Sequence, residues 1–260
     1  MKSFILMLFT FTFVLYTDYH LNQTQIQEEI KLQQIQKVQK ELQLKQEKKA
    51  ELQEKKLRET NSKKAHNQPS VSQKKKHFFS LVVPAIENIH KEQLENFLAV
   101  KQELSTGTIS PKIIKLKKLY RVTTNEALLL ALKPHPQSIV IAQAAIESAW
   151  GTSRFFREAN NIFGMWSKDP NEPRIAAGVK RAGKRTIWLR KFNNLDESIR
   201  QYYQTIGRVK QYQAFRELRY KTDDVTKLVK KLDKYSELGD EYTRILASVI
   251  RHNNLTRYDK

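Results

Sequence analysis

The sequence predicts a mostly helical (α+β) domain with a small β-hairpin lobe, and three observations lead to this fold class. The chain has 260 residues, 40% of them hydrophobic, so it can bury at least one full core. From residue 78 onward, apolar residues recur mainly at helical spacing. Only residues 186–192 alternate apolar and polar side chains as a strand does. Helices therefore build the core, and the alternating stretch belongs to a hairpin.

Two segments come before the predicted domain and its linker. Residues 1–20 hold one early Lys and then a largely apolar run, which is short for a membrane span and typical of a signal peptide or an inner-membrane anchor. Residues 21–58 lack Gly and Pro and are rich in good helix formers, which favours a charged helix. Lys45 and Lys49 interrupt its a/d rhythm. A solvated single helix and a weak coiled coil through residues 26–57, which would make oligomers, both stay open.

The predicted domain covers residues 78–258, after a polar linker at residues 59–77. Its first half predicts three helices. One follows Pro84, a second has Pro111 near its N-terminus, and a third, short helix is ended by Pro134.

The rest of the predicted domain is organised around residues 134–166, and this stretch begins with a fourth helix. Pro136 suits its first position, small and apolar residues make it a buried helix, and Gly151 suits the position just past its end. Glu147 then lies in the last turn, among apolar neighbours and at the negative end of the helix dipole. Both effects raise the pKa of a carboxyl toward the range of a general acid.

Two plainer interpretations of Glu147 exist, because acids are seldom buried unless they are paired. The carboxylate could be solvated on the polar side of the helix, or it could pair with Arg154 or Arg157. The residues around it favour a binding site instead. Amides bond sugar hydroxyls, and aromatic rings stack on the apolar faces of pyranoses. We therefore expect a carbohydrate substrate to bind at Gln143, Ser148, Trp150, Asn160, Asn161, Phe163, Gly164 and Trp166.

The stretch AQAAIESAWGTSRFFREANNIFGMW resembles the signature of the Bax and FlgJ-type N-acetylglucosaminidases, glycoside hydrolase family 73, with the Bax branch nearest. The shared pattern is A-Q-A-x-x-E-S-x-W-G, then S-x-F, then N-N-x-F-G. The resemblance covers about residues 78–255. It implies a lysozyme-like fold and an endo-β-N-acetylglucosaminidase that cleaves the β-1,4 bond after N-acetylglucosamine in the cell-wall glycan. It also implies that Glu147 is the catalytic acid. Export to the periplasm or cell envelope is indicated by the apolar run in residues 1–20.

Residues 168–195 predict a loop followed by the hairpin, which in the family forms one wall of the groove. Glycoside hydrolysis usually needs two carboxyl groups, and the family's second Glu has been placed on the hairpin lobe. The acids available here are Asp169 and Glu172. Glu172 is the candidate, and a surface loop acid is the alternative. A route in which the substrate's own N-acetyl group is the nucleophile needs Glu147 alone.

Helices also end the chain. Asp196 is a candidate N-cap for one, Asp223 or Asp224 for the next, and Asp240 for the last. The run K-Y-S-E-x-G-D-E-Y resembles a later motif of the family in which a Tyr lines the site, and the matching residue is Tyr235. Other members have Thr-Asp-Pro after that Tyr, where this chain has Ser-Glu-Leu-Gly. Ordinary helix packing is the alternative for Tyr235.

Charge and composition limit the partners. The formal net charge is +20, with 32 Lys and Arg against 19 Asp and Glu in residues 81–260, which favours a polyanion such as peptidoglycan. No base-reading motif indicates nucleic acid. The chain has no Cys, no H-E-x-x-H run and no Gly-rich phosphate loop, so we expect neither a metal nor a cofactor.

Two rival functions remain at this point. A lytic transglycosylase shares the lysozyme-like fold and the Glu-Ser pair, but those enzymes continue differently after that pair. The second rival is a non-catalytic envelope protein that binds glycan, and the presence of Glu147 argues against it.

Overall fold

The computed structural model describes residues 37, 39–56, 69–178 and 186–259, which belong to two compact units, Met1–Gln68 and Pro69–Lys260. The predicted signal peptide or anchor at residues 1–20 lies outside the described residues. In the first unit, residues 39–56 are helical and exposed. Within the ranges given above, no helix is both long enough and apolar enough to cross a membrane.

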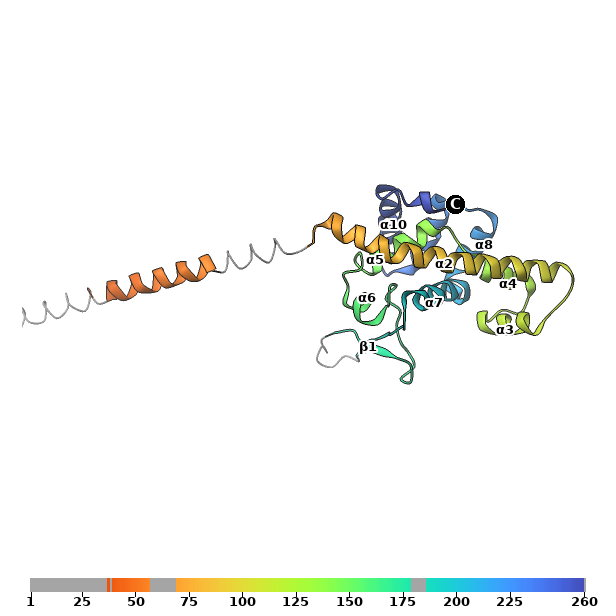
Figure 1. The fold of residues 1–260 in the computed structure, drawn as a ribbon, viewed down its shortest axis with the longest axis horizontal. Coiled ribbons are helices and arrows are strands. Elements are labelled where there is room, and N and C mark those ends of the chain that lie inside the picture. The colour runs from red at the N-terminus through yellow and green to blue at the C-terminus, as the bar shows by residue number, and fades with distance from the viewer. Residues whose placement is uncertain (1–36, 38, 57–68, 179–185, 260) are drawn as a thin grey trace, which may run out of the picture. The chain divides into compact units, whose positions relative to one another are not determined.

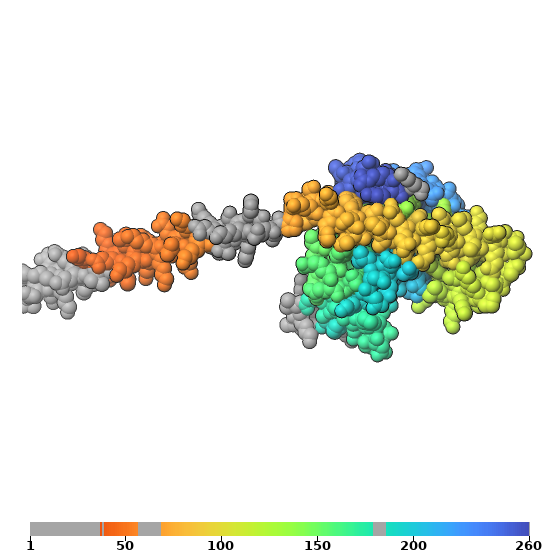
Figure 2. Space-filling view, viewed as in Figure 1, coloured from red at the N-terminus to blue at the C-terminus, as the bar shows by residue number. Residues whose placement is uncertain are grey.

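The second unit begins with helix α2, Val71–Ser105, which lies along the surface of that unit (Figures 1 and 2). Ser70 and Gln73 form a capping box at its start. The helix thus begins inside the predicted linker, seven residues before residue 78. It also continues through Pro84, where the sequence predicted a start. Pro84 and Ser80 are both exposed, so water can bond the Ser80 carbonyl that lacks a helical partner.

The main core forms around helix α5, Gln137–Glu147, whose residues are all buried from Gln137 to Ala145. This confirms the predicted core helix but not its predicted ends, because Pro136 is the N-cap rather than the first residue and the helix ends at Glu147, well before Gly151. Helix α2 packs against α5, and so do α10, Asp240–His252, and the short 3₁₀ helix η3, Leu255–Tyr258. Helix α7, Leu195–Arg208, packs against α2 with the predicted face inward: Ile199, Tyr202, Tyr203 and Ile206.

A smaller core lies between the end of α2, helix α3 (Pro111–Tyr120) and helix α4 (Asn125–Leu132). Ser110 and Thr124 cap the two short helices with their side chains, and Pro111 is the first residue of α3, as predicted.

The β lobe is a two-stranded antiparallel sheet of β1, Arg174–Ala176, and β2, Trp188–Arg190, with Ile175 opposite Leu189. Leu189 also forms a β-bridge with Trp166. The predicted hairpin is confirmed, with a second strand shorter than residues 186–192. Helix α6, Arg154–Ala159, contacts β1.

The remaining elements are short and carry the residues that close the core. They are η1 (Lys210–Tyr212), α8 (Gln213–Lys221), α9 (Val225–Val229) and η2 (Lys230–Tyr235). Asp224 caps α9, as one of the two predicted candidates. The predicted caps at Asp196 and Asp240 are wrong by one or two residues. Asn194 caps α7 by accepting from the Glu197 backbone N–H, and Gly239 precedes α10.

Candidate active site

Glu147 is the last residue of α5 and is partly buried. Burial raises the pKa of its carboxyl, and a hydrogen bond with the Tyr242 side chain works against that rise. Arg154, one of the predicted alternative partners, pairs instead with Glu158 at 3.1 Å. The structure therefore places Glu147 where the sequence predicted it, in the last turn of the helix, and burial raises the pKa of its carboxyl.

A strained turn follows Glu147. Ala149, Trp150 and Gly151 all have left-handed backbone conformations, with φ of 50°, 58° and 74°. Such strain in non-glycine residues is costly and gathers at functional sites. Ser148 holds the turn, because its hydroxyl donates to the Ala144 carbonyl at 2.6 Å and accepts from the Gly151 N–H at 2.9 Å.

Trp150 is held against α2 by the rings of Phe78 and Phe79, whose centroids lie 5.5 and 5.7 Å from its own. The Lys75 ammonium lies 4.5 Å from the centroid of the Trp150 ring. Trp150 therefore joins the turn after Glu147 to the first turns of α2. These contacts cover much of the Trp150 ring, so the ring is not open enough to stack on a sugar.

The N-N-x-F-G motif fastens this region to the β lobe. The Asn161 side chain donates to the carbonyls of Met165 and Arg190, both at 2.9 Å, and accepts from the Met165 N–H. The Asn160 amide donates to the carbonyls of Phe192 and Asn193. Both side chains thus hold the chain that leads into and out of the hairpin.

The rest of the motif approaches Glu147 itself. Gly164, with φ of 64°, lies beside the carboxyl, since a Cβ at this position would be 4.0 Å from Glu147 Oε2. Phe163 is buried and stacks on Tyr202, with centroids 4.2 Å apart and planes at 18°. Glycine keeps this side of the acid free of a side chain, and the left-handed backbone favours glycine for a second reason.

Burial, and after it the charge of Glu147, raises the phenol pKa of three tyrosines from the C-terminal elements: Tyr212 on η1, Tyr235 on η2 and Tyr242 on α10. Tyr235 and Tyr242 stack with centroids 5.3 Å apart. Burial raises the pKa of each phenol, so all three are neutral hydroxyls at neutral pH. The resemblance indicated Tyr235, which does lie in this cluster. The hydrogen-bond partner of Glu147 is Tyr242, which sequence reasoning missed.

For four predicted substrate-binding residues the structure corrects the role. Gln143 and Ser148 have no exposed surface, and Asn161 has 1%. The polar atoms of these three side chains are hydrogen-bonded within the protein, and the half-buried Asn160 donates from its amide nitrogen to two backbone carbonyls. These hydrogen bonds position the residues that form the site, and the bonded atoms are not available to a ligand. The sequence signal that can identify such residues is a polar side chain on a helix face that is otherwise apolar. Trp166, by contrast, is 63% exposed and is free to contact a ligand.

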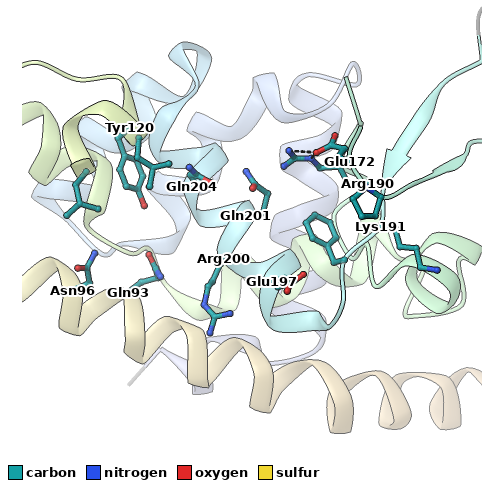
Figure 3. Close-up of a pocket in the computed structure, with 14 residues that line it drawn as sticks. Gln93, Asn96, Tyr120, Glu172, Arg190, Lys191, Glu197, Arg200, Gln201 and Gln204 are labelled. Carbon is teal, nitrogen blue, oxygen red and sulfur yellow. Dashed lines mark hydrogen bonds and ion pairs between the residues drawn. The ribbon is translucent and has the colours of Figure 1, made fainter. Parts of the chain in front are cut away.

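Glu172 is held in an ion pair at the edge of a hollow. It pairs with Arg190, whose Nη2 and Nε lie 2.6 and 2.7 Å from Glu172 Oε2. The Arg190 guanidinium holds the pKa of the Glu172 carboxyl below its usual range. The pair lies at a hollow of about 540 Å³ between α2, α3, α7 and the hairpin, across from Tyr120 (Figure 3), and Glu147 is not among the lining residues.

No group of three or more His, Asp or Glu side chains in the described parts of the chain could hold a metal ion.

Comparison with known proteins places the chain among enzymes. The family described as mannosyl-glycoprotein endo-β-N-acetylglucosaminidase matches residues 129–255. The protein Bax of Escherichia coli is 29% identical over 208 residues, which cover 71% of this chain and 72% of Bax.

Two solved structures show a partial likeness. The catalytic domain of the autolysin Auto from Listeria monocytogenes has 17% identity and a TM-score of 0.44, with 78% of this chain and 97% of that domain covered. The glycoside hydrolase domain of FlgJ from Salmonella typhimurium has 22% identity and a TM-score of 0.39, with 54% and 89% covered.

The family match and the buried acid agree on the class of protein, which is a glycoside hydrolase. More particularly, residues 129–255 match the mannosyl-glycoprotein endo-β-N-acetylglucosaminidase family, and the chain is similar to Bax.

Proposed function

We propose that this domain is a peptidoglycan hydrolase that cleaves the β-1,4 bond after N-acetylglucosamine, with Glu147 as its general acid. The observation that carries the proposal is the position of Glu147. Its carboxyl is partly buried at the end of α5, lies within electrostatic reach of three neutral tyrosines and has a raised pKa. A carboxyl that keeps its proton nearer to neutral pH can protonate a departing sugar oxygen.

The chemistry starts with proton transfer from Glu147 to the glycosidic oxygen as the bond to C1 breaks. We propose that the acetamido oxygen of the same N-acetylglucosamine attacks C1, because the Glu172 carboxylate is already paired with Arg190. The resulting cyclic oxazolinium ion is then opened by water. The Glu147 carboxylate takes a proton from that water, which restores the acid and leaves a reducing end.

Charge supports the choice of substrate. The chain carries +20, and residues 81–260 alone contain 32 Lys and Arg against 19 Asp and Glu. Peptidoglycan carries lactyl and peptide carboxylates, so long-range attraction would concentrate the enzyme on it. Such a substrate lies outside the cytoplasm, and we propose that the enzyme acts there.

The variant Glu147→Gln tests the assignment, because an amide keeps the shape of the side chain but cannot donate the proton. Loss of general acid catalysis costs about 10²- to 10⁴-fold in rate. We expect a loss in this range for release of soluble fragments from purified sacculi, with an unchanged circular dichroism spectrum. A variant that keeps half of the wild-type rate would remove Glu147 from the mechanism.

A further inference from the structure

A continuous chain of hydrogen bonds crosses the core and ends at Glu147. Its first bond joins Arg219 Nη1 to His135 Nδ1 at 3.3 Å, and its second joins His135 Nε2 to the Tyr202 hydroxyl at 2.8 Å. All its members up to Tyr242 are buried. They come from α8, the α4–α5 connection, α7, α5 and α10. We call it the buried chain, and its members in order are Arg219, His135, Tyr202, Gln143, Tyr242 and Glu147.

Arg219 is an expensive residue to bury. Its side chain is 1% exposed, and no carboxylate among the described residues forms an ion pair with it. The Leu130 and Ala131 carbonyls at the end of α4 accept from Nη2, while Nε has no hydrogen-bond partner in the described structure. Burial lowers the pKa of Arg219 to about 10, so it is still a cation at neutral pH. A buried cation without an ion-pair partner normally destabilises a fold, so we expect that Arg219 serves a function in this position.

The role follows from the fact that a guanidinium can only donate hydrogen bonds. His135 Nδ1 must therefore accept from Arg219, which leaves the proton of the neutral ring on Nε2. Burial and the Arg219 charge both lower the pKa of His135, so the ring is neutral. His135 Nε2–H then donates to the Tyr202 oxygen.

The same assignment of donors and acceptors gives the direction of every later hydrogen bond. Because the Tyr202 oxygen is already an acceptor, its own hydrogen goes to Gln143 Oε1 at 2.5 Å. The other end of that amide is then Nε2–H, which donates to the Tyr242 oxygen at 3.0 Å. The hydrogen of Tyr242 then goes to its other hydrogen-bond partner, the Glu147 carboxyl.

We propose that Arg219 and His135 are positioning residues for Glu147, which act through Tyr202 and Gln143 to make Tyr242 a hydrogen-bond donor to the acid. This inference rests on the proposed function of Glu147. Neither Arg219 nor His135 reaches the substrate.

The direction of the last bond matters for catalysis. A carboxylic acid that receives a hydrogen bond on one oxygen carries its own proton on the other oxygen, where a substrate can take it. If Tyr242 were an acceptor, it would hold the proton of Glu147 and keep it from the glycosidic oxygen. The fixed donor thus presents the acid in its productive form, without reorganisation during the reaction.

The first test needs no activity. Two-dimensional ¹⁵N–¹H correlation of the imidazole rings distinguishes the two neutral tautomers and the imidazolium. The chain has six histidines, and the His135 signals are those that vanish in His135→Gln. We expect the Nε2–H tautomer for His135 between pH 6 and 8. The Nδ1–H tautomer, or a charged ring, would overturn the proposal whatever the enzyme hydrolyses.

The second test uses two neighbouring buried tyrosines of α7 whose hydroxyls have different hydrogen-bond partners. Tyr202 is a member of the buried chain, whereas Tyr203, also buried on α7, bonds His90 at 3.1 Å and does not lead to Glu147. The variants Tyr202→Phe and Tyr203→Phe remove the same atom from the same helix. Loss of stability alone would affect both.

The readout is kcat and its pH profile. The titratable groups that interact with Glu147 in the described structure are Tyr212, Tyr235 and Tyr242, and all three stay neutral over this range. A donor to the carboxylate lowers the pKa of Glu147. Removing the fixed donor raises this pKa and moves the alkaline limb of the profile to higher pH.

We expect Tyr202→Phe to lower kcat about tenfold and to move the alkaline limb upward by about half a unit to one unit, as loss of one hydrogen bond would. The variant Tyr242→Phe should move the limb at least as far in the same direction. Tyr203→Phe should leave both kcat and the limb unchanged. Equal profiles for Tyr202→Phe and Tyr203→Phe would refute the proposal. If instead Glu147→Gln were active, the proposed function would fail while the tautomer of His135 could still be as expected.

Discussion

At the scale of single residues, Glu147 trades stability for function. Burial raises the pKa of its carboxyl above the ordinary value of 4.5, so the folded protein binds a proton there more tightly than the unfolded chain. The stabilising effect of that proton is fully present below about pH 4.5 and is lost as the pH rises through the pKa of the folded protein. At neutral pH the fold bears the cost of a partly buried carboxylate.

The variant Glu147→Gln should therefore be at least as stable as the wild type, in a pH-dependent manner. Glutamine does not titrate, so the difference in melting temperature should be near zero at pH 4 and should favour the variant at pH 8. Differential scanning calorimetry at both pH values measures it. A variant that melts below the wild type at pH 8 would mean that the carboxylate stabilises the fold.

How far the sequence could predict the site differs from residue to residue. Glu147 could be predicted because its helix, its apolar neighbours and its motif are local in the chain. The role of Gln143 could not, because the partners of its polar atoms, Tyr202 and Tyr242, lie on other elements. The role of Ser148 depends on the left-handed turn after Glu147, which brings the Gly151 N–H to its hydroxyl. Tyr242 is a further case. Its spacing on α10 is that of an ordinary core residue, and only the packing of α10 on α5 brings it to the acid.

At the scale of elements, the hairpin and the loop before it form a unit closed by the Glu172–Arg190 pair. Both side chains are partly buried, at 20% and 31% exposure, and β2 carries the arginine. The sequence predicted this hairpin from one alternating run. It could not show that the only nearby Glu is bound by a residue of the second strand, because that contact depends on the strand register.

Replacing Glu172 by Gln should leave catalysis largely intact. The amide can still accept from Arg190, and Glu147 does not line the hollow where the pair lies. We expect kcat on sacculi to stay within about threefold of the wild type, far from the 10²- to 10⁴-fold loss that removal of a catalytic acid or base brings. Steady-state kinetics of Glu172→Gln beside Glu147→Gln gives the comparison. A hundredfold fall would restore Glu172 as the second catalytic carboxyl.

At the scale of the whole molecule, the structured domain is longer than the sequence predicted. Residues 71–77 look like a solvated linker because they are polar and rich in lysine. In the structure they form the first turns of α2, and Lys75 donates to Asn253 at 2.9 Å while it lies over Trp150. The helical class of the fold was predictable from apolar spacing. These contacts were not, since they join residues about 75 and 178 positions apart.

A fragment of residues 69–260 should therefore be more stable than one of residues 78–260. The shorter fragment loses the capping box of α2, worth about 0.5–2 kcal/mol, and the cation–π contact of Lys75, worth about 0.5–1 kcal/mol. For a domain of this size, about 1–3 kcal/mol corresponds to a melting temperature lower by roughly 2–12 °C. Thermal unfolding followed by circular dichroism measures the difference, and Ser70→Ala in the full chain separates the cap from the rest. Equal melting temperatures would mean that residues 71–77 do not stabilise the domain and behave as a linker.

The central claim is hydrolysis of peptidoglycan by Glu147 with release of reducing N-acetylglucosamine ends. Mass spectrometry of the muropeptides from purified sacculi, with borohydride reduction to mark reducing ends, tests it most directly. Digestion by the wild-type chain should produce fragments that end in reduced N-acetylglucosamine, and digestion by Glu147→Gln should produce almost none. Fragments that end in anhydro-muramic acid would instead show a lytic transglycosylase and would contradict the account.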